Sequence, residues 1–204
     1  MSFKERSKLA KNVETGLDKI LTETGIEITD ISYENIFKES LRNKMRKEYN
    51  SNNIIHVRFQ PDRFAYIDNK RNFFLEYKIC NTPINYDSRV EYLRKVSGDE
   101  TLNKSNIGAI EATALLNYTK ISSKLGLDVA IIVYCTYHEP KFVAEWVSNI
   151  KIKNEDNVII GEGNASRTPY VNVNLDEFRG VEDFFKQEFN WDVLLNGIKN
   201  KNKL

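Results

Sequence analysis

Two acidic residues and a lysine at short spacing form the part of this sequence best suited to chemistry. Thirteen residues separate the pair Pro61-Asp62 from the triplet Glu76-Tyr77-Lys78. In a β-strand, residues two apart share a face, so Glu76 and Lys78 point the same way. If one tight turn joins two strands here, Asp62 pairs within a residue or two of them on that face. The hairpin would then gather two carboxylates and one ammonium group.

Such a constellation suits a divalent metal ion. Two carboxylates a few ångströms apart repel by about 1 kcal/mol in water and by about 4 kcal/mol at an effective dielectric near 20. A proton, a lysine or a cation must offset that repulsion. Mg²⁺ binds through one or two carboxylates together with waters and substrate phosphate, and we expect Mn²⁺ to substitute for it. The predicted chemistry is phosphodiester cleavage, with Lys78 orienting the attacking water.

The spacing matters more than the acid-x-Lys pattern, which occurs elsewhere in the chain. Asp68-Asn69-Lys70 and Glu139-Pro140-Lys141 have the same pattern. Both are turn or loop sequences with no hairpin acid upstream, so we assign them no function. The 76–78 triplet instead lies on an apolar strand one turn after Pro61-Asp62. The alternative interpretation is a solvated hairpin face with an ordinary ion pair that contributes at most about 1 kcal/mol.

A third acid, Glu14, lies on a predicted helix from Ser2 to Thr24. Apolar residues recur there at helical spacing, and Gly25 supplies a C-cap. Glu14 is beside this stripe, at the edge of the buried face, from which a carboxylate can reach a sheet. The alternative interpretation is an exposed helix residue without a role.

The same signals predict the other elements. Strand-forming and helix-periodic runs alternate along the chain. We expect strands at 26–31, 54–59, 64–67, 73–79, 129–134, 158–160 and 170–173. We expect helices at 37–49, at 107–124 and at 181–198, with a loop of weak helical content at 81–106. This order predicts one α/β domain over residues 1–204.

Composition limits the classes of protein to consider. The chain has 204 residues, 41% of them hydrophobic, two cysteines and a net charge of +1. No apolar run approaches the roughly 18 residues of a membrane span. No secretory signal is recognisable at the N-terminus, and two cysteines make no disulfide framework, so we expect a cytoplasmic protein. Near-neutral charge means that contacts with nucleic acid must come from local basic patches, whose alternative interpretation is solvated surface.

With Pro61-Asp62, Glu76-Tyr77-Lys78 and the preceding Glu14 helix, the sequence resembles the PD-(D/E)xK nuclease superfamily. Within it, the chain is most similar to archaeal Holliday junction resolvases. The resemblance implies a restriction-endonuclease-like core, with a central mixed β-sheet flanked by helices. It implies Asp62 and Glu76 as metal ligands, the Tyr77 carbonyl as a candidate third ligand, Lys78 as the catalytic lysine and Glu14 as an auxiliary acid. A helical insertion at about 30–53 departs from a minimal resolvase.

The leading hypothesis is therefore a Mg²⁺-dependent DNA endonuclease that cleaves duplex or branched DNA. Cleavage of two strands with one site per chain favours a homodimer, and no membrane partner is expected. Two alternatives stay open. The chain could be a catalytically silent DNA-binding or assembly module with a nuclease fold, or it could be an RNA endonuclease.

The remaining candidates have a structural interpretation as the simpler one. His56 lies on a predicted strand, and His138 follows another. Neither histidine pairs with a nucleophile at a recognisable spacing. The segment 161–164 matches neither a dinucleotide-binding fingerprint nor a P-loop. Residues 166–168 could hold a phosphate in a loop, but a plain turn is favoured. Three aromatic residues could stack on bases but are more often core in such folds: Tyr137, Trp146 and Tyr170.

Overall fold

The computed structural model describes residues 3–47, 60–67, 71–81, 83–84, 86–150, 158–160, 169–191 and 194. Several predictions lie outside these residues: the strand at 54–59 with His56, the turn at 68–70, the loop at 161–168 and the C-terminal part of the last predicted helix. One of the candidate basic patches, formed by Lys199, Lys201 and Lys203, lies outside them too.

The elements follow one another in a mixed order along the chain. The helices are α1 (Phe3–Glu23), α2 (Tyr33–Ile36), α3 (Glu39–Lys47), α5 (Asp87–Ser97), α6 (Ala112–Leu125) and α7 (Val181–Phe185), with short 3-10 turns η1 (Val147–Asn149) and η3 (Leu175–Glu177). The strands are β1 (Ile26–Asp30), β2 (Arg63–Ile67), β3 (Arg71–Cys80), β4 (Ile107–Glu111), β5 (Val129–Cys135), β6 (Phe142–Trp146), β7 (Val158–Ile160), β8 (Pro169–Asn174) and β9 (Arg179–Gly180).

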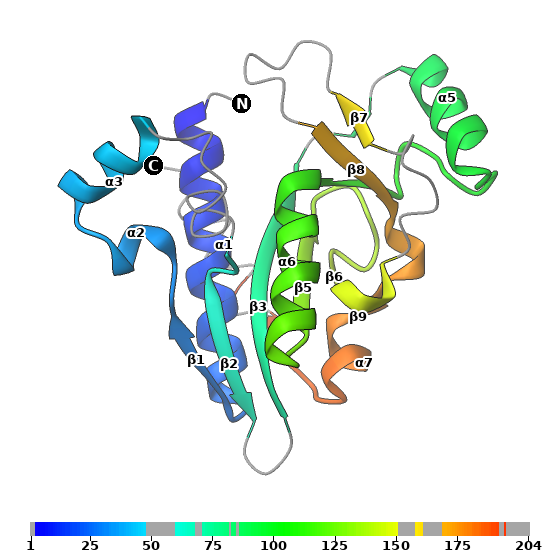
Figure 1. Cartoon of the computed structure of the whole chain (residues 1–204). Coiled ribbons are helices and arrows are strands. Elements are labelled where there is room, and N and C mark those ends of the chain that lie inside the picture. Colours follow the sequence, from blue (N-terminus) through cyan, green and yellow to red (C-terminus); the bar gives the residue numbers. More distant parts are fainter. Residues whose placement is uncertain are drawn as a thin grey trace.

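A six-stranded sheet with the order β1-β2-β3-β5-β6-β9 forms the centre of the structure. Strands β3 and β5 pair in parallel, and the other neighbours are antiparallel. Helices α1 and α6 lie on either side of this sheet (Figure 1). The predicted α/β class, with a central mixed sheet flanked by helices, is confirmed. A smaller antiparallel sheet, β4-β8-β7, lies beside it.

Strand β3 presents different residues to the two helices. Phe73, Leu75 and Tyr77 are buried in a cluster with the apolar stripe of α1. Phe74 packs against the other cluster, which is built around α6 and β5. Alternation along the strand therefore places Glu76 and Lys78 on the α6 side. The α1 helix follows its predicted bounds closely and is followed by Gly25, whose φ of 87° suits glycine.

Some predicted elements were wrong, and pairing in the tertiary structure explains most of the differences. Residues 107–111 form strand β4, which pairs with β8, so the helix begins at Ala112. Ile107 and Ile110 are three residues apart, which fits one face of a helix. In the strand they lie on opposite faces and pack in different clusters. The predicted loop at 81–106 contains the 11-residue helix α5. Strand β6, which was not predicted, pairs with β5.

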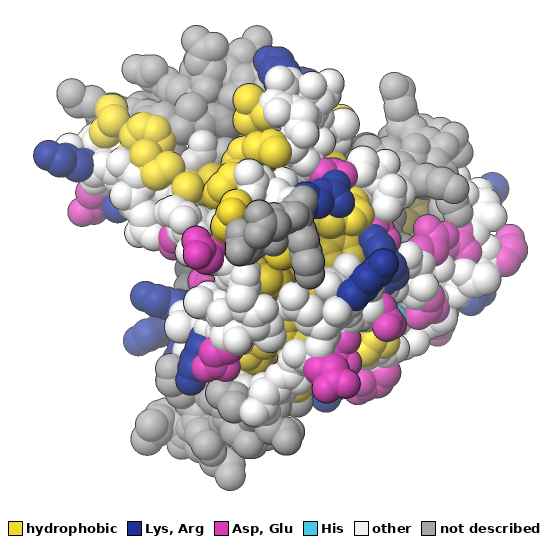
Figure 2. All heavy atoms as spheres, turned by 90° about the horizontal axis from the view of Figure 1, so that it is seen from below, with side chains coloured by type: hydrophobic (Ala, Val, Ile, Leu, Met, Phe, Trp, Pro, Cys, Tyr) yellow, Lys and Arg dark blue, Asp and Glu magenta, His cyan; other side chains and the backbone are white. Residues whose placement is uncertain are grey.

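The last predicted helix, 181–198, is interrupted after its first five residues: positions 186–190 are not helical, whereas Trp191 and Leu194 are. Helix α7 ends at Phe185, and Lys186 has a left-handed φ of 57°. Within the predicted insertion at 30–53, the described residues form α2 and α3. Among the described residues, no helix is long and apolar enough to span a membrane. Seen from below, acidic and basic side chains occur side by side with apolar ones between them (Figure 2).

Gly108 distinguishes strand β4 from the helix that the sequence predicted. A Cβ at this position would lie 2.7 Å from Leu175 Cδ2 and 3.3 Å from Val173 Cγ2. Leu175 is fully buried and has little room to move. We expect Gly108→Ala to lower the free energy of unfolding by about 1–3 kcal/mol, measured by urea denaturation. In a helix, the same change would raise it by about 1 kcal/mol. Ala109→Ser, at the exposed neighbouring position, should change it by less than about 0.5 kcal/mol.

Candidate active site

The β2–β3 pairing brings Asp62 beside Glu76. Arg63 is opposite Leu75, so Asp62, one residue before β2, comes next to Glu76. The backbone N–H of Asp62 donates a hydrogen bond to Glu76 Oε2, at 3.2 Å. At the other end of the pair, Ile67 is opposite Arg71.

Lys78 is bound to the same carboxylate. Its Nζ lies 2.6 Å from Glu76 Oε1, and the Glu76 side chain is only 5% exposed. Burial opposes the charge on Lys78, but Glu76 outweighs it, so the pKa of Lys78 is raised above its ordinary value. Lys78 is therefore an ammonium group at neutral pH. This agrees with a role in orienting a water or a phosphate and not with a role as a base.

Asp62 is a strongly perturbed acid. Burial and the neighbouring Glu76 raise the pKa of Asp62 to about 7, although Lys78 and Arg63 act in the opposite direction. At neutral pH, its carboxyl group is thus close to half protonated. The cations present do not fully balance the negative charge at this site. A bound cation would favour the ionised form.

Glu14 and Arg63 meet on the α1 side of the sheet. Arg63 Nη2 lies 3.3 Å from Glu14 Oε2, and the Arg63 side chain is 6% exposed. Burial raises the pKa of Glu14, while Arg63 opposes the shift. Glu14 in turn contributes to the raised pKa of Asp62. The sequence placed Glu14 near the acidic pair, and in the structure it acts on them from the α1 side, through its charge.

The carbonyl of Tyr77 is directed to the space that Asp62 borders. Backbone groups point alternately to the two neighbouring strands. Phe74 N donates to Asp128 O, and Cys80 O accepts from Thr136 N, so even-numbered residues of β3 face β5. The Tyr77 carbonyl therefore faces the β2 side, beyond the first β2–β3 pair. Pro61, which would come opposite by extension of the register, has no N–H to donate to it.

These groups fit a magnesium ion as oxygen donors. Asp62 and Glu76 offer carboxylates and Tyr77 offers a carbonyl, all hard ligands. In the described part of the chain, no three His, Cys, Asp or Glu side chains are grouped so that they could hold a metal. Mg²⁺ usually takes only one or two carboxylates and completes its shell with water and phosphate. The donor set therefore suits Mg²⁺ better than a metal that needs a closed side-chain cage.

Four residues around this site were not predicted from the sequence: Asp18, Arg63, Tyr118 and Glu111. Asp18 accepts hydrogen bonds from Arg63 Nε at 2.7 Å and from the Tyr77 hydroxyl at 2.8 Å. After the effect of burial, the largest contribution to the raised pKa of Tyr118 comes from Glu76. Glu111, at the end of β4, contributes to the raised pKa of Lys78.

One of these had a clear signal in the sequence. Arg63 alternates with the buried Ala65 and so occupies a core-facing strand position, where a charged residue needs a partner. Asp18 follows Glu14 by four residues and shares its helix face. Tyr118 was placed in an apolar helical stripe, and Glu111 stood within the same predicted helix. Only the fold brings these two to Glu76 and Lys78.

Other candidates have structural roles. His138 is buried, with Nε2 2.9 Å from Asp176 Oδ1 and Nδ1 2.9 Å from Pro140 O. Trp146 packs edge-on against Phe73 in the core, with ring centroids 5.3 Å apart.

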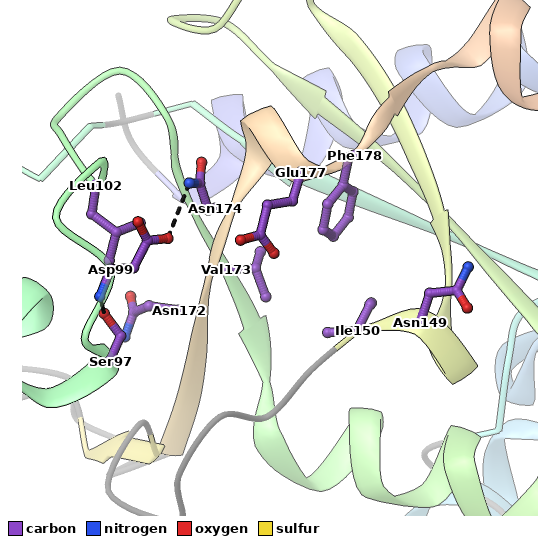
Figure 3. A pocket seen from close by; sticks show the side chains of 10 residues that line it. All are labelled: Ser97, Asp99, Leu102, Asn149, Ile150, Asn172, Val173, Asn174, Glu177 and Phe178. Atoms are coloured by element: carbon purple, nitrogen blue, oxygen red, sulfur yellow. Dashed lines mark hydrogen bonds between the residues drawn. The ribbon is translucent and has the colours of Figure 1, made fainter.

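A pocket beside β8 contains none of the predicted site residues (Figure 3). Polar side chains line much of it, and several of them bind neighbouring groups. Asn174 Nδ2 donates to Asp99 Oδ2 at 3.1 Å, and Asn149 Nδ2 donates to Glu145 Oε1 at 2.8 Å. These contacts explain the polar lining without a ligand.

Comparisons with known proteins give little beyond this geometry. No protein-family model matches the chain. No curated protein matches it. Among solved structures, the chain is similar to Hjc of Archaeoglobus fulgidus, a Holliday junction resolvase from an archaeal hyperthermophile. The TM-score is 0.47 and the sequence identity is 8%, over 89% of this chain and 98% of that chain. At such values, the interpretation of the site depends on its own residues.

The raised pKa of Asp62 predicts how stability depends on pH. Between pH 3.8, the ordinary pKa of an aspartate, and about pH 7, Asp62 is largely protonated in the folded protein but ionised in the unfolded chain. The free energy of unfolding should therefore fall as pH rises through this range. Asp62→Asn should remove this loss and stabilise the metal-free protein at pH 8 by about 1–3 kcal/mol, after allowance for partial exposure. Urea unfolding in EDTA at pH 5 and pH 8 measures it.

Asp30 is the matched control. Burial opposes its ionisation, but hydrogen bonds from Ser32 outweigh it and lower the pKa of Asp30. Asp30→Asn should therefore destabilise the protein at pH 8, the opposite sign. Equal behaviour of the two variants would contradict the assignment of a strained acid at position 62.

Proposed function

We propose that this chain is a Mg²⁺-dependent endonuclease that hydrolyses phosphodiester bonds in DNA. The observation that carries the proposal is the meeting of Asp62, Glu76 and Lys78 at the start of β2 and the middle of β3. The resemblance of Pro61-Asp62 and Glu76-Tyr77-Lys78 to PD-(D/E)xK nucleases adds support. Duplex or branched DNA is the proposed substrate, and a homodimer is proposed as the form that cuts both strands.

In this proposal, Asp62, Glu76 and the Tyr77 carbonyl hold Mg²⁺. The bound ion would offset charge that develops on the phosphate and promote ionisation of the attacking water. Glu76 Oε1 fixes Lys78 Nζ at 2.6 Å, and the other N–H groups of Lys78 are donors for the attacking water or a phosphate oxygen. Hydrolysis joins the water oxygen to phosphorus and breaks one P–O ester bond, and the alcohol that leaves takes up a proton.

The local charge favours an anionic substrate only once a cation is bound. Glu14, Asp62, Glu76 and Glu111 outnumber Lys78 and Arg63 around the site. Phosphate would meet repulsion from these carboxylates. A divalent ion reverses that local balance, which is why the proposal joins metal and phosphate in one site.

A second function is favoured by one specific contact. Lys78 already engages Glu76 at 2.6 Å, so one carboxylate oxygen of the proposed ligand set has a partner within the chain. An ion pair of this kind can be a purely structural feature. The second candidate is thus a DNA-binding or assembly module without turnover. It predicts nucleic-acid binding that is indifferent to EDTA, whereas the endonuclease requires Mg²⁺ or Mn²⁺ binding that Glu76→Ala abolishes in calorimetry.

Cleavage assays test the endonuclease directly. Linear duplex DNA, four-way branched DNA and RNA should be digested in parallel, with Mg²⁺ and with EDTA. We expect Mg²⁺-dependent cutting of DNA, with RNA cutting pointing instead to an RNA endonuclease. Asp62→Asn, Glu76→Gln and Lys78→Ala should each reduce the rate by about 10²–10⁴-fold, because each removes charge or a donor used in the transition state.

Lys141→Ala supplies the control within the same chain. Lys141 belongs to the triplet Glu139-Pro140-Lys141 and makes an exposed ion pair with Glu139 at 3.8 Å. The Lys141→Ala variant should therefore cleave DNA at the wild-type rate. Full activity in Asp62→Asn would reject the assignment of the site, and no activity on any substrate with Mg²⁺ or Mn²⁺ would favour the silent module.

A further inference from the structure

The residues next to the proposed metal ligands meet on the opposite side of the sheet. Arg63 follows Asp62, and Tyr77 stands between Glu76 and Lys78. Alternation turns both side chains away from the acidic pair, toward α1. There, one oxygen of Asp18 accepts from both of them, from Arg63 Nε at 2.7 Å and from the Tyr77 hydroxyl at 2.8 Å.

Further contacts join this group into one unit. The Arg63 guanidinium carbon lies 4.3 Å from the centre of the Tyr77 ring. Arg63 also binds Glu14, one helical turn before Asp18. The Arg63 and Tyr77 side chains are nearly fully buried, whereas the Asp18 side chain that binds both is 33% exposed. A buried donor or acceptor that loses its partner is costly, which makes the arrangement rigid.

We propose that Asp18 is a positioning residue, which fixes β2 and β3 relative to each other through Arg63 and Tyr77 and so sets the separation of the metal ligands on the far side. The inference rests on the proposed function for its metal. The Tyr77 hydroxyl bond fixes the rotation of a residue whose carbonyl is a candidate ligand. The Arg63 bond fixes the backbone immediately after Asp62. Partners of this kind, one shell beyond the ligands, commonly change metal affinity by 10–100-fold.

A purely structural role for Asp18 makes a different prediction. If Asp18 only anchors α1 to the sheet, its loss lowers stability but leaves the metal site unchanged in the folded protein. Leu21→Ala is the matched variant for that case. Leu21 is a fully buried α1 residue in the apolar cluster that joins this helix to the sheet, so its truncation weakens the anchoring without touching the Asp18 hydrogen bonds.

The experiment measures Mn²⁺ binding by calorimetry on the full chain without nucleic acid. We expect Asp18→Ala, which removes the shared acceptor, to weaken binding by about 10–100-fold, and Tyr77→Phe to weaken it less, because the latter removes a single donor. Leu21→Ala should bind like wild type under conditions where it is folded. Wild-type affinity in both Asp18→Ala and Tyr77→Phe would overturn the proposal. If Asp18→Ala does not fold, Tyr77→Phe decides.

A second readout does not involve metal. The Asp62 amide donates to Glu76 Oε2 at 3.2 Å, so its hydrogen exchange reports the ligand separation. Exchange at Asp62 should accelerate by about tenfold in Asp18→Ala, while the Ile132 amide in central strand β5 stays protected. If wild type binds no Mn²⁺, the proposed function fails, and exchange at Asp62 alone decides whether Asp18 positions the two strands. Unchanged exchange there would overturn the positioning role.

Discussion

The candidate site depends on the balance between clustered carboxylates and the two cations that hold them. Lys78 engages Glu76 on the α6 side of the sheet, and Arg63 engages Glu14 and Asp18 on the α1 side. Neither cation fully compensates Asp62, whose pKa is raised to about 7. Neighbouring carboxylates in a partly buried site repel each other, and the rest of the fold must supply the energy that keeps them together. The proposed metal ion would favour the ionised form of Asp62.

The β2–β3 hairpin makes this balance possible because one residue step changes the face of the sheet. Asp62 is on the α6 side of the sheet with Glu76, whereas its sequence neighbour Arg63 is on the α1 side. The same holds for Glu76 and Tyr77 on the next strand. Each position that could serve chemistry thus has a neighbour that anchors it to a helix. Pro61 has no backbone N–H and therefore cannot donate a hydrogen bond to the Tyr77 carbonyl.

The surroundings of the hairpin are less specific. The parallel pairing of β3 with the wholly buried β5 keeps the middle of β3 rigid. Helix α6 closes the acidic side with Tyr118, and Glu111 enters from the end of β4. The pocket of Figure 3 has a polar lining but none of these charged groups. The candidate site and this pocket are therefore separate features of the molecule.

The sequence supported the long α1 helix, the strands β1, β2, β3 and β5, and the α/β class. Along α1, apolar residues recur at helical spacing over 21 residues, and β5 is an almost uninterrupted apolar run, which is typical of a central strand covered on both faces. The sequence failed at Ile107–Glu111, where the two isoleucines have helical spacing but pairing with β8 decided for a strand that is buried on both faces. It failed at β6, whose buried Glu145 is satisfied by Arg179 from another element. It also missed α5, whose amphipathic face packs on residues that follow it in the chain.

The candidate site shows the same division between local and long-range information. By itself, the sequence determined that Asp62, Glu76 and Lys78 belong to one hairpin, because strand alternation and a short turn leave few other arrangements. Only the tertiary structure decided that Arg63 and Tyr77 share one oxygen of Asp18. The partners in that contact are 45 and 59 residues apart, and no local pattern encodes a meeting of helix and sheet at that separation. It also decided the charge state of Asp62, since burial and neighbouring charge exist only after the chain has folded.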